Sequence, residues 1–230
     1  MLTLEALAIR RGDFALDADL SIAQGARAAV IGPSGAGKST LLGCIAGFVP
    51  AAAGRVVWQG RDITRAAPAA RMVSMLFQDH NLFPHLTAAQ NIGLGLRPDL
   101  RLSADQHARV DHALEQVGLH GYGTRKPAQL SGGQQGRVAI ARVLVQQNPL
   151  VLLDEPFAAL GPALKAEMLD LVADMADSQG ATVLMVSHDP SDAMRLCPQA
   201  VLVAEGRALP PQDTGALLAD PPPALRAYLG

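Results

Sequence analysis

The chain has 230 residues, of which 49% are apolar, 17% are charged and only 3% are aromatic. This balance predicts a packed globular protein with a sizeable core, and it excludes a mainly disordered chain. The 19 Lys and Arg residues are offset by 21 Asp and Glu residues, which gives a formal net charge of -2. Because a chain without excess positive charge is poorly suited to holding a nucleic-acid backbone, we expect no nucleic-acid partner.

Cysteine usage and hydropathy narrow the class further. Cys44 and Cys197 are far apart and neither belongs to a CxxC pair, so we predict neither a disulfide nor a zinc site. No apolar run reaches the roughly 18 residues that a membrane-crossing helix needs. The N-terminus also lacks the basic-then-apolar layout of a signal peptide. We therefore expect any membrane association to depend on a partner.

Short apolar segments rich in β-branched residues recur along the chain and are predicted strands: 27–31, 55–58, 72–77, 150–153, 182–186 and 200–203. Helical segments lie between several of them. In one, residues 103–117, Ser103 and Gln106 form a capping-box pair before apolar residues at helical spacing. The alternation of strands and helices predicts an α/β fold with a mainly parallel sheet.

We interpret residues 1–230 as a single domain. Predicted strands are missing between about residues 80 and 130, so residues 80–133 are interpreted as a helical subdomain inserted in the α/β core. Prolines mark a C-terminal tail, residues 209–230, that we expect to form no further domain. Five histidines show no metal-ligand spacing and are interpreted as surface or loop residues: His80, His85, His107, His112 and His120.

A phosphate-binding loop follows the predicted strand at 27–31. The segment matches the pattern GxxxxGK[ST], between an apolar strand and an apolar helical run, which is the context that this motif requires. In such a loop, backbone N–H groups surround phosphate oxygens, the lysine offers a charge to the β- and γ-phosphates, and the hydroxyl binds Mg²⁺. The predicted nucleotide-binding residues are Gly32, Pro33, Ser34, Gly35, Ala36, Gly37, Lys38, Ser39 and Thr40, with Ser39 also a magnesium ligand.

Two acidic residues follow the predicted strand at 150–153. Asp154 and Glu155 are expected at the carboxyl end of that strand, where open α/β sheets bind ligands. There, Asp154 is predicted to hold Mg²⁺ through water, and Glu155 to orient or deprotonate an attacking water. An acidic turn is the alternative for these two residues taken alone, and the phosphate-binding loop favours the catalytic interpretation.

A third motif points to a family. The segment Ser131-Gly132-Gly133-Gln134 precedes an apolar helical run and resembles the signature sequence of ABC ATPases. The order and spacing of Lys38, Ser131 and Asp154 agree with that family. Within the resemblance, Gln78 matches a glutamine that reaches Mg²⁺ and the attacking water, and His188 matches the switch histidine that hydrogen-bonds the γ-phosphate. The resemblance thus implies that the catalytic residues are Lys38, Gln78, Glu155 and His188.

The resemblance extends to about Gly206 and is to the nucleotide-binding subunits of ABC transporters. It implies an ATPase with a P-loop NTPase core that uses ATP and Mg²⁺. In that family two subunits form a head-to-tail dimer, so Ser131, Gly132, Gly133 and Gln134 are expected at the ATP of the partner subunit. It also implies an integral-membrane permease, and through it a periplasmic solute-binding protein, with this chain on the cytoplasmic face of the bacterial inner membrane.

Residues 73–78, 81–83, 85–87 and 91–96 look most like the ATPase subunits of bacterial thiamine importers. This implies import of thiamine or thiamine phosphates. Another small-solute importer, an exporter, or a lipoprotein-release or division complex shares the same chemistry. A soluble ABC ATPase acting on DNA or ribosomes is disfavoured, because the segment between Gln78 and Ser131 is too short for a coiled-coil insertion.

The resemblance further implies that the helical subdomain docks on the permease, with the Gln78 loop as the hinge. Residues 81–87 follow that glutamine and contain four apolar side chains. They either fill the groove that receives a permease helix or pack inside their own subdomain.

Several positions depart from the family pattern. Ala158 and Gly161 replace a polar residue and an aspartate in the segment after the two acids, which predicts a working but less tightly coupled ATPase. A non-hydrolysing subunit is the alternative, which the intact catalytic residues disfavour. The aromatic residue that stacks on adenine is absent from its expected place, where Arg11 is our candidate and Phe14 the alternative. Gly136 stands where the family often has glutamine, and we assign no consequence to it.

Overall fold

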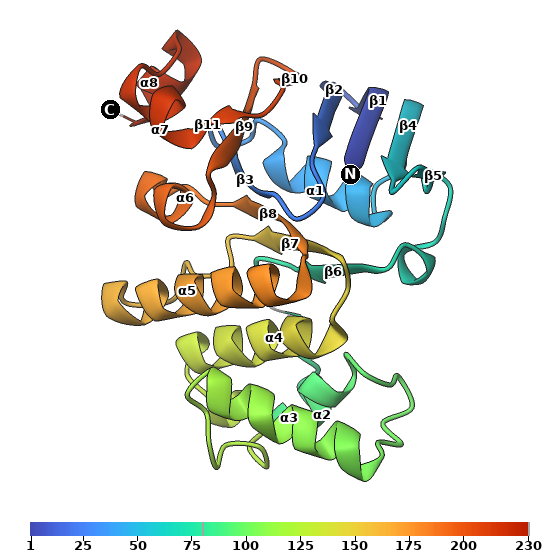
Figure 1. Cartoon of the computed structure of the whole chain (residues 1–230), viewed down its shortest axis with the longest axis vertical. Coiled ribbons are helices and arrows are strands. Elements are labelled where there is room, and N and C mark those ends of the chain that lie inside the picture. The colour runs from blue at the N-terminus through green and yellow to red at the C-terminus, as the bar shows by residue number, and fades with distance from the viewer. Residues whose placement is uncertain (80, 230) are drawn as a thin grey trace.

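A computed structural model describes residues 1–79 and 81–229 and shows a continuous sheet with helices on both sides (Figure 1). The α/β fold predicted from the sequence is confirmed, and all six predicted strands are present within two residues of their expected bounds. The prediction for His80 falls outside the described residues. The strands are β1 (Leu2–Arg11), β2 (Phe14–Ile22), β3 (Arg27–Ile31), β4 (Ala53–Trp58), β5 (Arg61–Asp62), β6 (Val73–Leu76), β7 (Leu150–Asp154), β8 (Thr182–Val186), β9 (Gln199–Ala204), β10 (Arg207–Ala208) and β11 (Gln212–Asp213).

The strand order of the sheet is β5-β4-β1-β2-β10-β9-β3-β8-β7-β6, and β11 pairs with β9. Two short 3-10 turns, Pro68–Ala70 and Pro127–Gln129, lie in the connections. The helices are α1 (Lys38–Ala46), α2 (Ala88–Gly93), α3 (Ala104–Gln116), α4 (Gly132–Gln146), α5 (Pro162–Gln179), α6 (Pro190–Leu196), α7 (Thr214–Ala219) and α8 (Pro223–Leu229).

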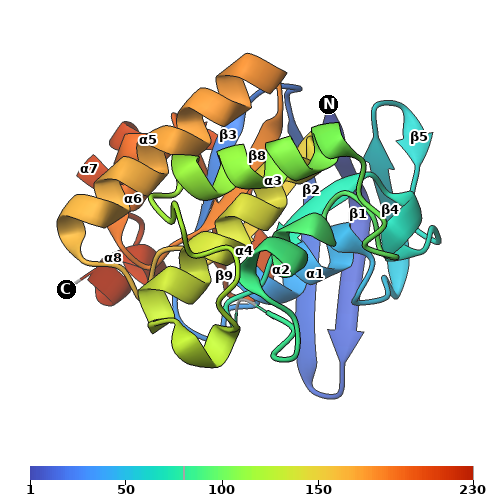
Figure 2. The ribbon, with the colours of Figure 1, turned by 90° about the horizontal axis from the view of Figure 1, so that it is seen from below.

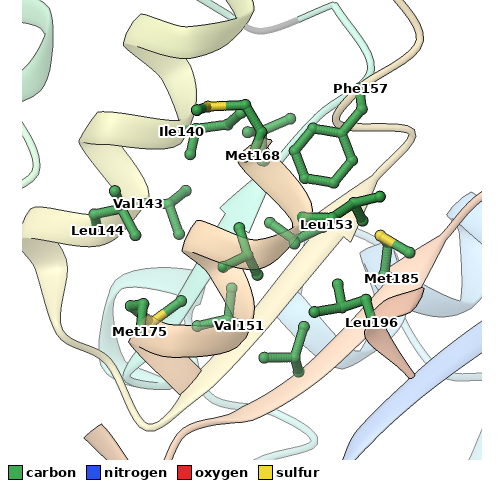
Figure 3. Close-up of a cluster of buried hydrophobic side chains, with 14 of the residues drawn as sticks. Ile140, Val143, Leu144, Val151, Leu153, Phe157, Met168, Met175, Met185 and Leu196 are labelled. Atoms are coloured by element: carbon green, nitrogen blue, oxygen red, sulfur yellow. The ribbon is translucent and has the colours of Figure 1, made fainter. Parts of the chain in front are cut away.

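Strands β3, β6, β7, β8 and β9 form the parallel part of the sheet. Every residue of β7 and β8 is buried, because helices cover both faces. Alternate side chains of β7 point to opposite faces: Leu150 and Leu152 belong to the core around α1, whereas Val151 and Leu153 belong to the core around α4 and α5. Figure 3 shows this second core, in which Ile140 of α4 and Met168 of α5 gather with Val151 and Leu153 of β7. Helices α1 and α4 therefore lie on opposite faces of the sheet.

Strands β1, β2, β4 and β5 add an antiparallel part to the sheet. Their burial differs from that of the central strands. In β2 every second residue from Leu16 to Ile22 is buried, and Asp17 and Asp19 are exposed between them. This is the pattern of a strand with one face in water. The sequence analysis did not identify β1 and β2, whose apolar residues alternate with polar ones instead of forming a continuous run.

Three helices, α2, α3 and α4, lie between β6 and β7 in sequence, and Figure 2, seen from below, shows them grouped together in front of the sheet. The helix predicted at 103–117 is confirmed as α3, which begins at the predicted capping box of Ser103 and Gln106. Helix α4 packs on α2 and α3 and also against β6. Helix α4 thus links the helical group to the sheet. The bounds 80–133 of an inserted helical subdomain stay a prediction.

The C-terminal tail is folded against the rest of the chain. Helices α7 and α8 both contact β9, and their side chains Leu217 and Leu225 are buried in the same core as α4 and α5. Among residues 1–79 and 81–229, no helix combines the length and the apolar character needed to span a membrane.

Candidate functional site

The phosphate-binding loop joins β3 to α1 at the carboxyl edge of the parallel strands. Two of its glycines are required by their surroundings and by their positive φ angles. A Cβ on Gly32 would lie 2.0 Å from the carbonyl oxygen of Val203, and one on Gly37 would lie 2.4 Å from the ring of Phe14. Helix α1 begins without a side-chain cap. The N–H groups of its first turn are therefore suited to an anion.

Lys38 is the first residue of α1 and its side chain is buried. Its Nζ donates hydrogen bonds to the carbonyl oxygens of Gly32, at 2.8 Å, and Pro33, at 2.9 Å. Burial lowers the pKa of Lys38, whereas the nearby charges of Glu155 and Asp154 raise it. An ammonium group binds an anionic oxygen more strongly than a neutral carbonyl. The side chain is thus placed to exchange these carbonyls for phosphate oxygens.

Ser39 and Asp154 connect the loop to the end of β7. The hydroxyl of Ser39 donates a hydrogen bond to Oδ1 of Asp154 at 2.9 Å, and Asp154 is only 5% exposed. Burial raises the pKa of Asp154, and the hydrogen bond from Ser39 partly opposes this shift. Hydroxyl and carboxylate oxygens are hard ligands, and Mg²⁺ typically takes one or two of them together with phosphate oxygens and waters. This pair fits a magnesium ion that is shared with a nucleotide.

Glu155 and His188 meet at the same edge of the sheet. Nδ1 of His188 lies 3.0 Å from Oε1 of Glu155, because β7 and β8 are neighbours and each residue follows the end of its strand. Glu155 has a left-handed φ of 49°, and its N–H donates to the carbonyl oxygen of Val186 at 3.1 Å. Non-glycine residues seldom adopt this conformation except where their surroundings fix it, as they do in many active sites.

Gln78 lies at this edge as well, two residues after β6 ends. Strand β6 pairs in parallel with β7, with Leu76 opposite Leu153, and the side chain of Gln78 is exposed.

The loop after Gln78 is held by Asn91 of α2, whose carboxamide accepts from the N–H of Phe83 and donates to the carbonyl oxygen of Phe83. Within residues 81–87, Leu82 packs on the core, whereas Phe83 is 47% exposed, and docking of this segment on a permease stays a prediction.

The signature segment begins α4 on the other face of the sheet from α1. Ser131 is the N-cap residue: its hydroxyl accepts from the N–H of Gln134 and the side chain of Gln134 accepts from the N–H of Ser131. Gly133 lies against the segment after Glu155, since a Cβ there would be 3.1 Å from Leu160. The structure therefore brings the loop, the acids and His188 together at one edge, and it places the signature segment apart from α1.

Arg11 and Phe14 line one hollow of about 590 Å³, together with Gly12 and Thr40. Arg11 is exposed, whereas Phe14 is partly buried against the core and its ring occupies the space beside Gly37. The hollow lies next to the first turn of α1. Contact between adenine and Arg11 stays a prediction.

The sequence analysis missed two polar residues near these segments. Nζ of Lys165, on α5, lies 2.5 Å from Asp189 and 2.9 Å from Asp192. Arg142, on α4, donates to the carbonyl oxygen of Asn81 at 2.9 Å. Neither contact has a local motif, because the partners are 24 or more residues apart in sequence. For the contact of Lys165 with Asp189 and Asp192, the only local signal was the lysine itself, which is a rare residue type in this chain and lies four residues after Gly161.

The phosphate-binding loop before α1, together with the acidic pair Asp154 and Glu155 at the end of β7, defines the class of P-loop ATPases. The model of the family described as ABC transporter matches residues 16–158 of this chain. The chain belongs to the ABC transporter family and is an ATP-hydrolysing subunit of it.

Individual relatives agree with this assignment. The chain is 63% identical over 230 residues to a protein of Cereibacter sphaeroides named thiamine import ATP-binding protein ThiQ, and the match covers 100% of both chains. It is 51% identical over 207 residues to a Yersinia pestis protein of the same name, covering 90% of this chain and 88% of the relative. A solved dimeric structure of the ATP-binding cassette MJ0796, in a post-hydrolysis state with ADP and Pi, is 29% identical with a TM-score of 0.84, covering 93% of this chain and 99% of that one.

Proposed function

We propose that this chain energises the import of thiamine, or of thiamine phosphates, across the bacterial inner membrane by hydrolysing ATP. The observation that carries the choice of substrate is the identity of 63% over the full length of a relative named for thiamine import. The residues of the candidate site support the hydrolysis, and the similarity to this relative supports the substrate.

In the proposed site, backbone N–H groups of Ser34 to Gly37 surround the phosphates, and Lys38 leaves the carbonyls of Gly32 and Pro33 to bind them. Ser39, Asp154 and Gln78 would hold Mg²⁺, which neutralises charge on the phosphate oxygens. The 2.9 Å hydrogen bond between Ser39 and Asp154 supports this choice, because it already brings two hard oxygen ligands together.

Glu155 is the proposed general base. Its carboxylate is partly buried at the edge of the sheet, and the 3.0 Å contact with Nδ1 of His188 fixes one of its oxygens. The other oxygen can then orient a water molecule and accept its proton during attack on the γ-phosphate. With Nδ1 directed at Glu155, Nε2 is the nitrogen of His188 that would reach a phosphate oxygen. The pair thus couples recognition of the γ-phosphate to activation of water.

The working form proposed here is a homodimer. Ser131, Gly132, Gly133 and Gln134 begin α4 on the face opposite α1, so a second copy is needed to place a signature segment against the bound ATP. The dimeric state of the MJ0796 cassette supports this arrangement. The dimer would bind an integral-membrane permease from the cytoplasmic face, and through it serve a periplasmic solute-binding protein. Exposed Phe83 is a candidate contact to the permease.

Uptake of labelled thiamine tests the proposal. The chain and its permease and solute-binding protein are expressed in cells that lack their own thiamine importer ATPase, and wild type is compared with Glu155→Gln. Glu205→Gln is the matched control, since Glu205 shares the left-handed φ, at 50°, and lies in an exposed turn. We expect uptake with wild type and the control but not with Glu155→Gln. ATP hydrolysis without uptake would discard thiamine and favour another solute or an exporter.

A further inference from the structure

Lys165 is the centre of a network that joins two segments of the proposed site. It lies in the first turn of α5, where its N–H donates to the carbonyl oxygen of Gly161 at 2.9 Å. Its Nζ contacts Oδ2 of Asp189 and Oδ1 of Asp192, at the start of α6. The side chain of Lys165 is 20% exposed and that of Asp192 is 7% exposed, so these charges are largely removed from water.

The same network holds both neighbours of His188. The hydroxyl of Ser187 donates to Oδ2 of Asp192 at 2.9 Å, and the N–H of Asp189 donates back to Oγ of Ser187 at 3.1 Å. Asp189 also caps α6 by accepting from the N–H of Ser191 at 2.9 Å. The residue between Ser187 and Asp189 is thus fixed at both ends by groups that converge on Lys165.

A small cavity supports the same reading. Its volume is about 110 Å³, and Glu155, Leu160, Lys165 and His188 all line it. Lys165 therefore borders the space in which the proposed base and the switch histidine meet. The pKa of Asp189 is lowered to about 2, first of all by its hydrogen bond from Lys165, which keeps this carboxylate ionised across the physiological range.

We infer that Lys165 is a positioning residue: it ties the first turn of α5 to the loop of His188 and so keeps the imidazole aligned with Glu155. The inference rests on the proposed roles of Glu155 and His188. It also gives the segment between them a mechanical role, because residues 156–161 run directly from the base into the turn that carries Lys165. A displacement of that segment by a partner subunit would reach His188 through this lysine.

The molecule contains a matched control contact. Arg195 on α6 makes two hydrogen bonds to Asp170 on α5, at 2.8 and 2.6 Å. This ion pair joins the same two helices as Lys165 does, but both of its side chains are about half exposed and neither bonds to Ser187 or Asp189 among the residues that the structure describes. We expect its loss to weaken the contact of α5 with α6 and to leave the bonds of Ser187 and Asp189 in place.

The test measures steady-state ATP hydrolysis by the purified full-length chain and by Lys165→Met, Lys165→Arg and Arg195→Met. Because a small misplacement of catalytic groups costs up to about 100-fold in rate, we expect Lys165→Met to lower kcat by about 10- to 100-fold. The KM for ATP should stay within about twofold, since Lys38 and its loop are untouched. Lys165→Arg should restore most of the rate, and Arg195→Met should leave kcat unchanged.

A double-mutant cycle separates positioning from general stability. In a His188→Ala background, Lys165→Met should add less than about a twofold loss, because a residue that acts through His188 has nothing left to align. Equal losses in both backgrounds, an equal loss in Arg195→Met, or an unchanged kcat in Lys165→Met would each overturn the inference. If Lys165→Met folds poorly, Lys165→Met with Asp192→Asn removes the buried carboxylate together with its partner.

These outcomes are independent of the transported solute. Wild-type hydrolysis without thiamine uptake would reject the substrate and leave the role of Lys165 standing. Wild-type hydrolysis with no effect of Lys165→Met would reject that role and leave the ATPase standing.

Discussion

Helices α1 and α4 both begin at a segment where a phosphate is expected, but their first turns are built differently. Helix α1 starts after Gly37, which has a left-handed φ of 102°, and no side chain caps it. Helix α4 starts with a reciprocal capping box in which Ser131 and Gln134 satisfy each other's N–H groups. One start is thus arranged for an outside anion, whereas in the other two N–H groups are already satisfied by its own side chains.

The surroundings of the two helix starts differ as well. Beside α1, Lys38 and Asp154 are both buried charges, and burial shifts both pKa values toward the neutral forms. Glu155 adds a left-handed backbone conformation at the same edge. Unfavourable features of this kind are typical of active sites, where the surrounding structure holds them in place. The signature segment has no such features, and it depends on a second subunit to become part of a site.

The largest effect should come from the base beside α1. We expect Glu155→Gln to lower the rate of phosphate release by about 10²- to 10⁴-fold, because glutamine cannot accept the proton of the attacking water. ATP binding should persist, since the loop and Lys38 are unchanged. Equilibrium binding of a fluorescent ATP analogue checks this second point. A loss below about tenfold would mean that Glu155 positions the water while another group accepts its proton.

The next largest effect should come from the start of α4. Ser131→Ala removes a cap, which costs about 0.5–2 kcal/mol of stability, and also removes a group proposed to meet the partner's ATP. Ser103→Ala is the matched control, because α3 begins with the same kind of capping box. Both variants should unfold at lower denaturant concentration.

Only Ser131→Ala should slow ATP hydrolysis, and neither variant should change ATP binding to dilute monomers. Hydrolysis rates measured across protein concentration, together with binding at low concentration, distinguish these outcomes. If Ser131→Ala weakened ATP binding to the monomer, the contrast between the two helix starts would be wrong.

A third variant tests whether the site beside α1 reduces stability. The raised pKa of Asp154 means that folding disfavours its ionised form, so this residue costs stability as pH rises past its ordinary pKa of about 4. We therefore expect Asp154→Asn to stabilise the nucleotide-free protein at pH 7, by about 0.5–2 kcal/mol. The gain should shrink as pH falls toward 4.

Urea unfolding at several pH values measures this gain. Asp105→Asn is the control, since Asp105 is exposed in the first turn of α3, and there the substitution should give no gain. A variant of Asp154 no more stable than wild type would show that the hydrogen bond from Ser39 fully offsets the burial.

The difference between local motifs, such as the loop before α1, and contacts between distant segments also explains what could be predicted from the sequence. The phosphate-binding loop and the strands β7 and β8 are contiguous signals: one is a fixed motif, and the others are apolar runs buried on both faces. The capping box of Ser103 is equally local, with its partner three residues away.

Features that depend on tertiary contacts could not be found in this way. Strand β2 is not one of them: its strict alternation of buried residues with exposed Asp17 and Asp19 is a local signal, which a search for continuous apolar runs does not detect. Lys165 meets Asp189 only because α5 and α6 pack together, and nothing in either local sequence requires it. Close packing of side chains from distant segments positions a site, whereas local motifs identify its chemistry.

The smallest effect should come from α5, a third helix start that tests the rule that an uncapped start awaits an anion. Gly161 is its N-cap, has a φ of -70° and makes no side-chain hydrogen bond, and Pro162 follows it. No neighbouring heavy atom lies within 4 Å of the position of a Cβ, so aspartate fits without strain. We expect Gly161→Asp to stabilise the protein by only a few tenths of a kcal/mol, because glycine is already a fair N-cap.

The informative readout is thiamine transported per ATP hydrolysed, which Gly161→Asp should raise by restoring a charged contact across the dimer. Gly161→Asn is the matched control, because it supplies the same cap without the charge. A rise with aspartate alone would assign the effect to the charge, and an equal rise with asparagine would assign it to the cap of α5. If neither variant changed the ratio, the glycine would not be the cause of loose coupling, and α5 would be an uncapped helix start without a role in binding.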